Sequence, residues 1–420
     1  MKILWIVNTI FPYPSEQLGM KKNVFGGWLI GLAEKLKENK KIKLAIATVY
    51  DGKEIKKFKN DNIIYYLIPG RPAIKYHKSW ERDWKKINEE FQPDLVHIHG
   101  SEFLHGLAFV NACPEQRVII AIQGLTSVCS EVYYGNISAS EIIRNVTIRD
   151  ILRRDTIFKA KRKMQQRGES ERELIHKSNY VIGRTMWDYA NTKMINPNIK
   201  YYFLNETLRK GFYNKEWDIN KIERHSIFIG QAWYPIKGLH IALKAIKIIK
   251  SYYPDVKLYV AGNDFVTIKT FKDKLRQNGY SKYLNKLIKK YDLKDNVVFT
   301  GILSEEEMVD RFLKSNVFVC PSIIENESNA LSEAAIMGVP AVCSYVGGIP
   351  DRITHGINGF LYPFTEYAML AEYILRYFQD DQLCIEHGKK AKEEAEKRNN
   401  PEQNLEQVIK IYNEIIQKGE

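Results

Sequence analysis

Short apolar runs rich in β-branched residues alternate with helix-like segments along most of this chain, and the alternation starts afresh near its middle. The strand-like runs cover residues 3–7, 44–48, 95–98 and 118–122 in the first half, and 226–229, 257–261, 297–300, 317–320 and 341–343 in the second. Strands alternating with helices are typical of parallel sheets covered by helices. The pattern therefore predicts an α/β protein with two doubly wound parallel sheets.

The length of the chain fits two domains of about two hundred residues each, because it has 420 residues. The stretch 205–224 is polar and lies between the two series of strands, so we expect a first domain over residues 1–205 and a second over 206–400. Residues 401–418 carry apolar side chains at helical spacing, which predicts one amphipathic terminal helix.

The charge of the chain favours anionic partners. Lysine and arginine number 63 against 50 acidic residues, a net charge of +13, which suits nucleic acid, lipid headgroups or phosphorylated small molecules. Segment 142–178 is helical in composition and basic, and its part 149–167 is either a solvated helix or a surface for anionic lipid or a polyanionic acceptor. Nucleic acid is the least favoured partner, because the basic residues are not interleaved with stacking aromatic residues.

Cysteine usage and hydropathy limit the compartment. The five cysteines are scattered without a C-x-x-C pair, so we expect no disulfide framework and no cysteine-ligated metal, as in a reducing compartment. A transmembrane helix needs about 18 consecutive apolar residues, and the chain has no such run. These features predict a cytoplasmic protein.

The most informative window for chemistry runs from Cys320 to Pro340, where a strand, a polar loop and a helix follow one another. The helix is expected to begin near Asn329 and to end at Gly338, a suitable C-terminal cap. Unpaired amides and the helix dipole suit such an N-terminus to a diphosphate, and parallel sheets bind ligands at the carboxyl ends of their strands. The window predicts a phosphate-binding loop.

Two glutamates flank this predicted anion site, Glu325 in the loop and Glu333 in the helix. Because a carboxylate repels a phosphate, we expect both to accept hydrogen bonds from neutral hydroxyl groups, as a ribose and a hexose offer. The combination indicates a sugar nucleotide. The alternative is that both are ordinary solvated charges.

The E(x7)E pair of Glu325 and Glu333, with the segment 334–342 behind it, resembles the signature of the retaining GT-B glycosyltransferases of family 4, the glycosyltransferase group 1 family. Residues 346–361 resemble the continuation of that signature, with Asp351 where a glutamate is commoner. The resemblance implies that Glu325 contacts the transferred sugar and that Glu333 contacts the ribose. It assigns the phosphate contacts to the amides of Asn329, Ala330 and Leu331.

A second stretch, residues 228–239, resembles the loop in which family members carry an arginine and a lysine against the leaving diphosphate. Lys237 matches the lysine, whereas Gln231 stands in the position of the arginine. Losing a full cation weakens the stabilisation of charge that develops on the leaving group. Either another basic residue substitutes or turnover is slow.

Looser matches lie in the first half. Gly26 and Gly27 open a helix, and by resemblance this loop approaches the diphosphate, since paired glycines let a backbone come close to an anion. His97 and His99 alternate along a strand, so we expect one to point into the core and His99 to reach the cleft. The candidates for the acceptor or sugar site are His99, Gln123, where many relatives have a histidine, and Arg184, for which a structural ion pair is the alternative. We expect no metal site, because a third ligand is missing.

Taken together, the resemblance implies a GT-B fold with two Rossmann-like domains facing a cleft and the helix 401–420 packing back on the first. It implies a retaining, metal-independent hexosyltransferase without a cofactor, which uses a UDP- or GDP-type sugar and a glycan or lipid-linked acceptor in cell-surface polysaccharide assembly. Segment 149–167 would then touch the inner face of the plasma membrane. Two alternatives stay open, a catalytically idle GT-B-fold binding protein on an anionic membrane and a nucleotide-sugar epimerase or hydrolase.

Overall fold

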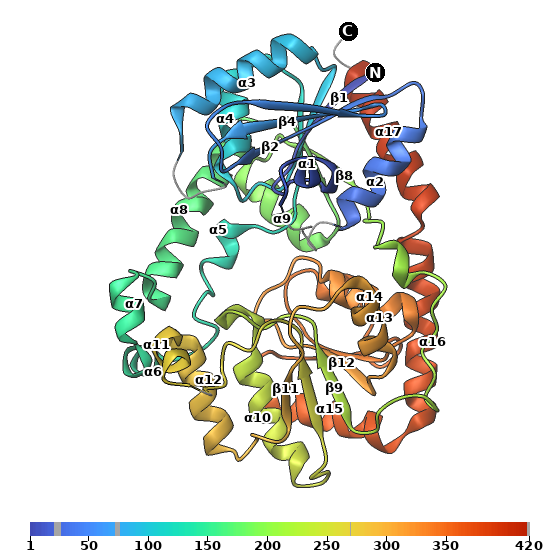
Figure 1. Cartoon of the computed structure of the whole chain (residues 1–420). Coiled ribbons are helices and arrows are strands. Elements are labelled where there is room, and N and C mark those ends of the chain that lie inside the picture. The colour runs from blue at the N-terminus through green and yellow to red at the C-terminus, as the bar shows by residue number, and fades with distance from the viewer. Residues whose placement is uncertain (21–26, 72–75, 269, 418–420) are drawn as a thin grey trace. The chain divides into compact units, whose positions relative to one another are not determined.

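The computed structural model describes residues 1–20, 27–71, 76–268 and 270–417, and its contacts divide the chain into two compact units. Unit 1 comprises Met1–Val128, Lys163–Arg209 and Arg398–Glu420, and unit 2 comprises Cys129–Arg162 and Lys210–Lys397. Figure 1 colours these segments along the chain. The expected junction after residue 205 lies four residues before the Arg209–Lys210 boundary. Segment Cys129–Arg162, by contrast, was expected in the first domain but makes its contacts within unit 2.

Unit 1 is built on an eight-stranded sheet, counted over the described residues, with the order β3-β4-β2-β1-β5-β6-β7-β8. The strands are β1 (Lys2–Ile6), β2 (Lys43–Tyr50), β3 (Lys56–Asn60), β4 (Ile63–Pro69), β5 (Leu95–His99), β6 (Val118–Ala121), β7 (Tyr180–Gly183) and β8 (Lys200–Phe203). Only β3 pairs antiparallel among these strands. Its two-residue connection to β4 allows a hairpin but not a parallel crossover.

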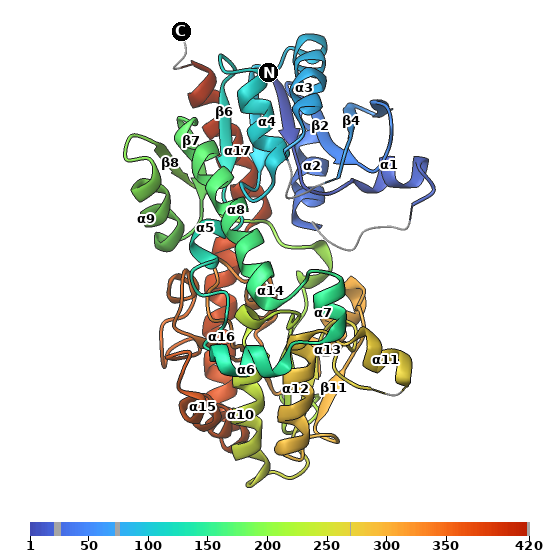
Figure 2. The same ribbon diagram turned by 90° about the vertical axis from the view of Figure 1, so that its left-hand side faces the viewer.

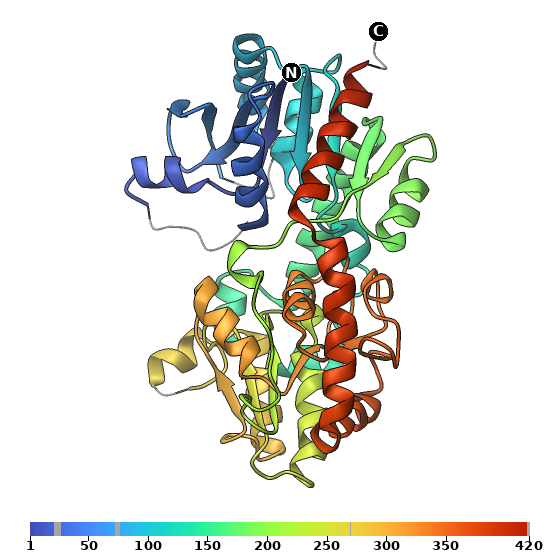
Figure 3. The same cartoon turned by 90° about the vertical axis from the view of Figure 1, so that its right-hand side faces the viewer.

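Helices cover both faces of this sheet. They are α1 (Pro12–Gln17), α2 (Gly27–Glu38), α3 (Lys78–Phe91), α4 (Leu104–Ala112), α5 (Thr126–Cys129), α8 (Ile157–His176), α9 (Met186–Ile195) and α17 (Pro401–Gln417), of which α5 and α8 cross the boundary to unit 2. One core cluster gathers Trp80, Trp84 and Phe109 of α3 and α4. The other joins α2 to α17, which runs beside the strands of unit 1 (Figure 3). The predicted terminal helix thus forms and belongs to unit 1.

Unit 2 contains a six-stranded sheet of parallel described strands in the order β11-β10-β9-β12-β13-β14. Its strands are β9 (Ser226–Ile229), β10 (Lys257–Val260), β11 (Val297–Phe299), β12 (Val317–Cys320), β13 (Ala341–Ser344) and β14 (Phe360–Tyr362). Its α-helices are α6 (Ala139–Asn145), α7 (Ile148–Leu152), α10 (Leu239–Lys250), α11 (Phe271–Arg276), α12 (Gly279–Lys290), α13 (Glu305–Leu313), α14 (Asn329–Met337), α15 (Tyr367–Gln379) and α16 (Asp381–Arg398). Short 3-10 turns are η1 (Lys210–Phe212), η2 (Pro235–Lys237) and η3 (Ile349–Asp351).

All nine runs predicted as strands form strands, and the two parallel sheets are confirmed. The basic segment 142–178 is not one continuous helix, because it contains the end of α6, then α7 and α8. Thr147 begins α7 with a capping box, and the positive φ of Arg154 ends it. No helix in the described ranges combines the length and apolar content that crossing a bilayer requires.

Candidate functional site

Two loops pack against each other at the carboxyl ends of β9 and β12 in unit 2. A Cβ at Gly238, where φ is +73°, would lie 1.7 Å from the carbonyl oxygen of Pro321. The N–H of Ile323 donates to the carbonyl oxygen of Ile236 at 2.7 Å. Only glycine suits this close approach and this backbone angle, and the contact brings the turn η2 against the loop that follows β12.

Lys237 and Glu325 meet where these loops touch. Nζ of Lys237 donates to Oε2 of Glu325 at 2.7 Å, and the side chains are only 15% and 14% exposed. Oγ of Ser322 donates to the same oxygen at 3.0 Å. Among the described residues, two N–H groups of Lys237 and the second carboxylate oxygen, Oε1 of Glu325, have no protein partner, so the pair can still bind an oxygen-rich ligand.

The environment keeps Lys237 charged. Burial alone would lower the pKa of its ammonium group, but the neighbouring Glu325 carboxylate outweighs burial and raises the pKa above its usual value. Lys237 is therefore a fixed cation at neutral pH, as a role against phosphate oxygens requires.

A third loop, after β13, supports Glu325 from its backbone side. The N–H of Gly348 donates to the carbonyl oxygen of Glu325 at 3.0 Å. A Cβ at Gly347, where φ is +55°, would lie 1.8 Å from that same oxygen. The glycine pair therefore fixes the position of Glu325.

The loop after β12, which carries Glu325, leads into the N-terminus of α14, as predicted. Ser328 caps it, and the N–H of Leu331 already donates to the Ser328 side chain and carbonyl. Asn329 is exposed and Ala330 half-buried, and their backbone amides donate no hydrogen bond in the described structure. Of the three amides predicted to bind phosphate, those of Asn329 and Ala330 are the available donors.

The remaining donor-site candidates in unit 2 lie in contrasting environments. Glu333 is in the second turn of α14 and only 5% exposed, so a ribose would meet it at a nearly closed surface. Gln231 is exposed immediately beyond β9. It supplies no charge to offset the missing arginine.

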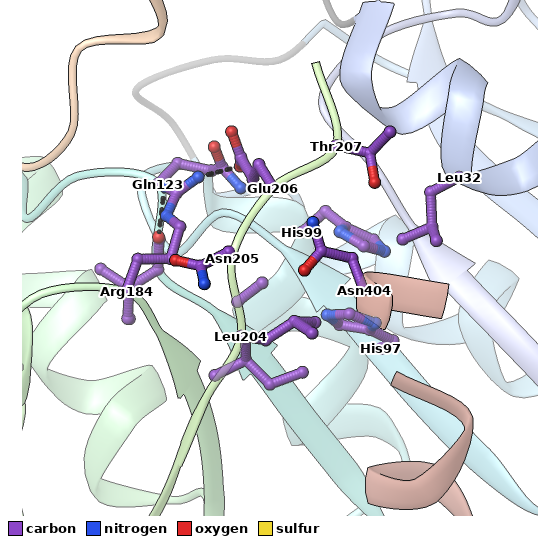
Figure 4. Close-up of a pocket in the computed structure, with 13 residues that line it drawn as sticks. Leu32, His97, His99, Gln123, Arg184, Leu204, Asn205, Glu206, Thr207 and Asn404 are labelled. Atoms are coloured by element: carbon purple, nitrogen blue, oxygen red, sulfur yellow. Dashed lines mark hydrogen bonds and ion pairs between the residues drawn. The ribbon is translucent and has the colours of Figure 1, made fainter. Parts of the chain in front are cut away.

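A small pocket in unit 1 brings together the three candidates for the acceptor side. His99, Gln123 and Arg184 all line it, together with His97 and residues after β8 (Figure 4). Its free volume of about 30 Å³ holds about two water molecules. In this conformation the pocket suits solvent, and a sugar ring would have to displace lining side chains.

The two histidines differ from the expectation. They lie on the same side of β5 with ring centroids 3.7 Å apart and stacked, because residues two apart on a strand share a face. His99 is 2% exposed and His97 1%. Burial lowers the pKa of His97 to about 3 and that of His99 well below its usual value, so both imidazoles are uncharged at neutral pH.

Arg184 forms the structural ion pair that the sequence left open. Its guanidinium pairs with the carboxylate of Glu206, and Nη2 donates to the carbonyl oxygen of Ile122 at 3.0 Å. Both side chains are more than nine-tenths buried. Its charge is thus already balanced within unit 1.

The predicted glycine pair lies at the edge of a described range, and the prediction about metal concerns the described residues as a whole. Helix α2 begins at Gly27, where a Cβ would meet the Arg209 side chain at 2.6 Å, while Gly26 lies outside the described residues. Within the described ranges no cluster of three or more His, Cys, Asp or Glu residues is arranged to hold a metal ion.

Sequence reasoning missed several partners of the site residues. Ser322 and the buried pair of Glu327 with Arg352, 2.9 Å apart, adjoin the donor-side loop. Glu206 and Tyr412 are the corresponding partners in unit 1. Residue spacing could indicate Ser322, three positions before Glu325, but Tyr412 lies 315 positions from its partner His97 and leaves no local signal.

A family model described as glycosyl transferases group 1 matches residues 210–415. N-acetyl-alpha-D-glucosaminyl L-malate synthase of Bacillus anthracis is 25% identical over 205 residues, which cover 48% of this chain and 48% of that protein. Amylovoran biosynthesis glycosyltransferase AmsK of Erwinia amylovora is 30% identical over 34% of each chain. The aligned part spans about half the length of the first curated relatives that the chain matches.

Solved structures match over the whole chain. Sucrose-phosphate synthase of Thermosynechococcus elongatus superposes with a TM-score of 0.72 at 16% identity and full coverage of both chains. Anabaena HepE in complex with UDP-glucose superposes with a TM-score of 0.67 at 15% identity, covering 99% of this chain and 100% of that one. This likeness shows the fold, two Rossmann-like α/β units of the GT-B type. The part of the chain that carries Lys237, Glu325 and Glu333 thus matches the group 1 glycosyl transferases.

Proposed function

We propose that the protein is a retaining glycosyltransferase of family 4 that moves a hexose from a nucleotide-diphosphate sugar to a glycan or lipid-linked acceptor. The observation that carries the proposal is the pair of Lys237 and Glu325 beside the N-terminus of α14. A cation and amides there suit a diphosphate, and a carboxylate suits sugar hydroxyls.

The division of labour follows from the unused hydrogen-bonding groups. Two N–H groups of Lys237 and the amides of Asn329 and Ala330 would bind the diphosphate, while Oε1 of Glu325 would accept from a hydroxyl of the hexose. Glu333 would contact the ribose. As the leaving phosphate gains charge during transfer, a fixed ammonium stabilises it.

The stereochemistry and the absence of a metal are part of the proposal. In front-face transfer the leaving phosphate takes the proton of the acceptor hydroxyl, so the protein needs no carboxylate nucleophile. Lys237 would supply the positive charge that a metal would otherwise bring, so we expect activity that needs no added metal or cofactor. Because Gln231 is uncharged, we expect turnover to be slow.

Named relatives support the substrate class. The Bacillus anthracis relative is named N-acetyl-alpha-D-glucosaminyl L-malate synthase, and AmsK is named an amylovoran biosynthesis glycosyltransferase. HepE has been solved with UDP-glucose. We therefore propose a UDP-type donor ahead of a GDP-type donor, and a role in cell-surface polysaccharide assembly at the cytoplasmic side of the membrane.

The test combines binding with turnover. Thermal-shift measurements with UDP-, GDP-, ADP- and CMP-sugars should identify one donor class, since a ligand that binds only the folded state raises the melting temperature. Product analysis with that donor should show transfer to added saccharide acceptors with the anomeric configuration retained. Lys237→Ala and Glu325→Ala should each lower transfer at least a hundredfold, whereas the exposed Lys390→Ala should not.

The alternatives give different results in the same experiment. Sugar release or epimerisation without an acceptor would indicate a hydrolase or epimerase. An idle binding protein is favoured by Gln231 and by the paired Arg184, and it would show a thermal shift without any product. Inverted product or full activity in both alanine variants would refute the proposal.

A further inference from the structure

Helix α7 exposes its apolar residues and buries an acidic one. Ile148, Ile151 and Leu152 are 74%, 64% and 77% exposed, whereas Asp150 is 1% exposed. Positions separated by three and four residues share one face of a helix, so the three aliphatic side chains form one apolar face. In the preceding helix α6, Ile143 is also 63% exposed.

Polar contacts within unit 2 hold α7 in this orientation. Oδ2 of Asp150 accepts from the N–H of Gly279, at the start of α12, at 2.8 Å and from the N–H of Thr147 at 3.2 Å. Arg149 pairs with Asp150 and Asp155. Because the side of α7 that carries Asp150 makes these contacts with unit 2, the apolar face points away from unit 2.

Helix α6 is anchored in the same way. It packs beside α12, and α7 packs beside α11 (Figure 2). Glu141 of α6 pairs with Lys286 of α12 at 3.2 Å, and Lys282 of α12 donates to the carbonyl oxygen of Arg144 at 3.2 Å. The two helices are therefore a built part of unit 2 rather than a loose connection.

Exposed basic residues follow the apolar face along the chain. Between Ile143 and Arg162 the sequence has seven basic residues and two acidic ones. Arg153, Arg154, Lys159 and Arg162 are exposed, and none of the four has an ion pair within the described structure. An apolar face bordered by lysine and arginine is the composition of helices that lie in the interface of an anionic bilayer.

Other occupants fit this surface less well. A second copy of the chain would bring its own basic residues against these, in a protein whose net charge is already +13. Nucleic acid would use the cations but leave the aliphatic side chains in water. A bilayer with anionic phospholipid supplies negative headgroups and an apolar interior together.

We propose that α6 and α7 dock unit 2 on anionic phospholipid bilayers, with Ile148, Ile151 and Leu152 entering the interfacial region. The exposed cations of residues 153–162 contact the headgroups. This inference does not depend on the transferase activity.

Vesicle sedimentation tests the proposal with the full-length protein. We expect sedimentation with vesicles of phosphatidylglycerol and phosphatidylcholine at a ratio of about 3:7, weaker binding to pure phosphatidylcholine, and release at high salt, since screening weakens headgroup contacts. Ile148→Gln/Ile151→Gln/Leu152→Gln should lower the partition coefficient about tenfold or more, because glutamine keeps helix propensity but removes the apolar face. Arg153→Gln/Arg154→Asn should lower it several-fold and flatten its salt dependence, asparagine being tolerated at the positive φ of residue 154.

Matched controls replace exposed apolar residues elsewhere, Met194→Gln in α9 and Ile385→Gln in α16, which are 67% and 41% exposed. They should bind vesicles like the wild type, and circular dichroism melts should show all variants folded. Wild-type protein that fails to sediment, or a triple variant that binds undiminished, overturns the proposal. So does a wild-type dimer that the triple variant dissociates, because the face would then be an interface between copies.

Discussion

Lys237 and Glu325 form a single ion-pair contact in the proposed donor site. Both side chains are mostly buried, and each neutralises the other in the ligand-free protein. On the proposed function, the phosphate oxygens of a bound donor would take over part of the pairing with Lys237. The pair would then contribute both to stability and to binding.

Removing the carboxylate should therefore cost stability. Glu325→Gln leaves the Lys237 ammonium without a counter-charge, and we expect the free energy of unfolding to fall by about 2 kcal/mol at pH 7. Urea unfolding monitored by fluorescence measures this. The matched control is Glu372→Gln, whose pair with Arg376 is more than half exposed and should change stability by less than about 0.5 kcal/mol. Equal effects in the two variants would contradict the structural role of the buried pair.

Glu102 provides a prediction about pH. Burial raises the pKa of its carboxyl to about 7; the nearby Arg167 and the amide of Asn8, which donates to Oε1 at 3.1 Å, oppose this shift, and Glu171 adds to it. Between the unfolded pKa and 7 the native state holds a proton that the unfolded chain has released, so stability falls as pH rises through this window.

Glu102→Gln removes that titration. Relative to the variant, the wild type should lose on the order of 2 kcal/mol of unfolding free energy between pH 5 and pH 8. Denaturant unfolding of both proteins across this range measures the difference. Parallel stability curves would show that Glu102 ionises as it does in water.

At the scale of elements, glycines rather than charged residues set the distances between the loops of unit 2. Gly238 and Gly347 let two backbones come within hydrogen-bonding range, which no other residue could match. The loops after β9 and β13 both make backbone hydrogen bonds to the loop that carries Glu325. Substitution of Gly347 should therefore impair donor binding as strongly as substitution of Glu325, which it supports.

Gly347→Ala and Gly356→Ala separate steric contact from backbone strain. Both glycines have positive φ, +55° and +74°, but only the Cβ at 347 meets an atom, while that at 356 meets nothing within 4 Å. In each variant the free energy of unfolding should fall by about 1–2 kcal/mol, because alanine is strained in the left-handed conformation. Only Gly347→Ala should also abolish the donor-induced thermal shift. A retained shift in Gly347→Ala would show that the loop after β13 does not position Glu325.

The sequence was sufficient for the strands, for α14 and for α17, because each carries its periodicity or its caps locally. It was insufficient where contacts join distant positions, as between His97 and Tyr412, or Arg184 and Glu206. Segment 129–162 was assigned to the first domain for the same reason, since its anchors, Gly279 and Lys286, lie more than a hundred residues away. The roles of Glu325, Glu333 and Lys237 came from resemblance and remain predictions.

At the scale of the whole molecule, the two units have separate sheets, and unit 1 depends on the last helix for its core. The hydroxyl of Tyr412 accepts from Nε1 of Trp5 at 3.0 Å and lies 2.6 Å from Nδ1 of His97. All of this is buried. Unit 1 is thus held together by groups from both ends of the chain.

Calorimetry should resolve this organisation. We expect two transitions, of which a bound nucleotide sugar raises the one that belongs to unit 2. Tyr412→Phe should lower the melting temperature of the unit 1 transition, because it leaves buried polar partners unsatisfied. The expected loss in unfolding free energy of unit 1 is about 1–3 kcal/mol. Tyr252→Phe, at a side chain 65% exposed, is the control. A single transition, shifted both by the nucleotide sugar and by Tyr412→Phe, would show that the two units unfold together.

The placement of α17 also bears on how the chain matures during synthesis. The ribosome releases the segments of unit 2 by Lys397, whereas unit 1 still waits for Val408, Ile411, Tyr412 and Ile415. The half of the protein that is translated first is therefore completed last. Until then one apolar face of the unit 1 sheet lacks its cover, and a chain truncated near residue 400 should leave that face exposed to water.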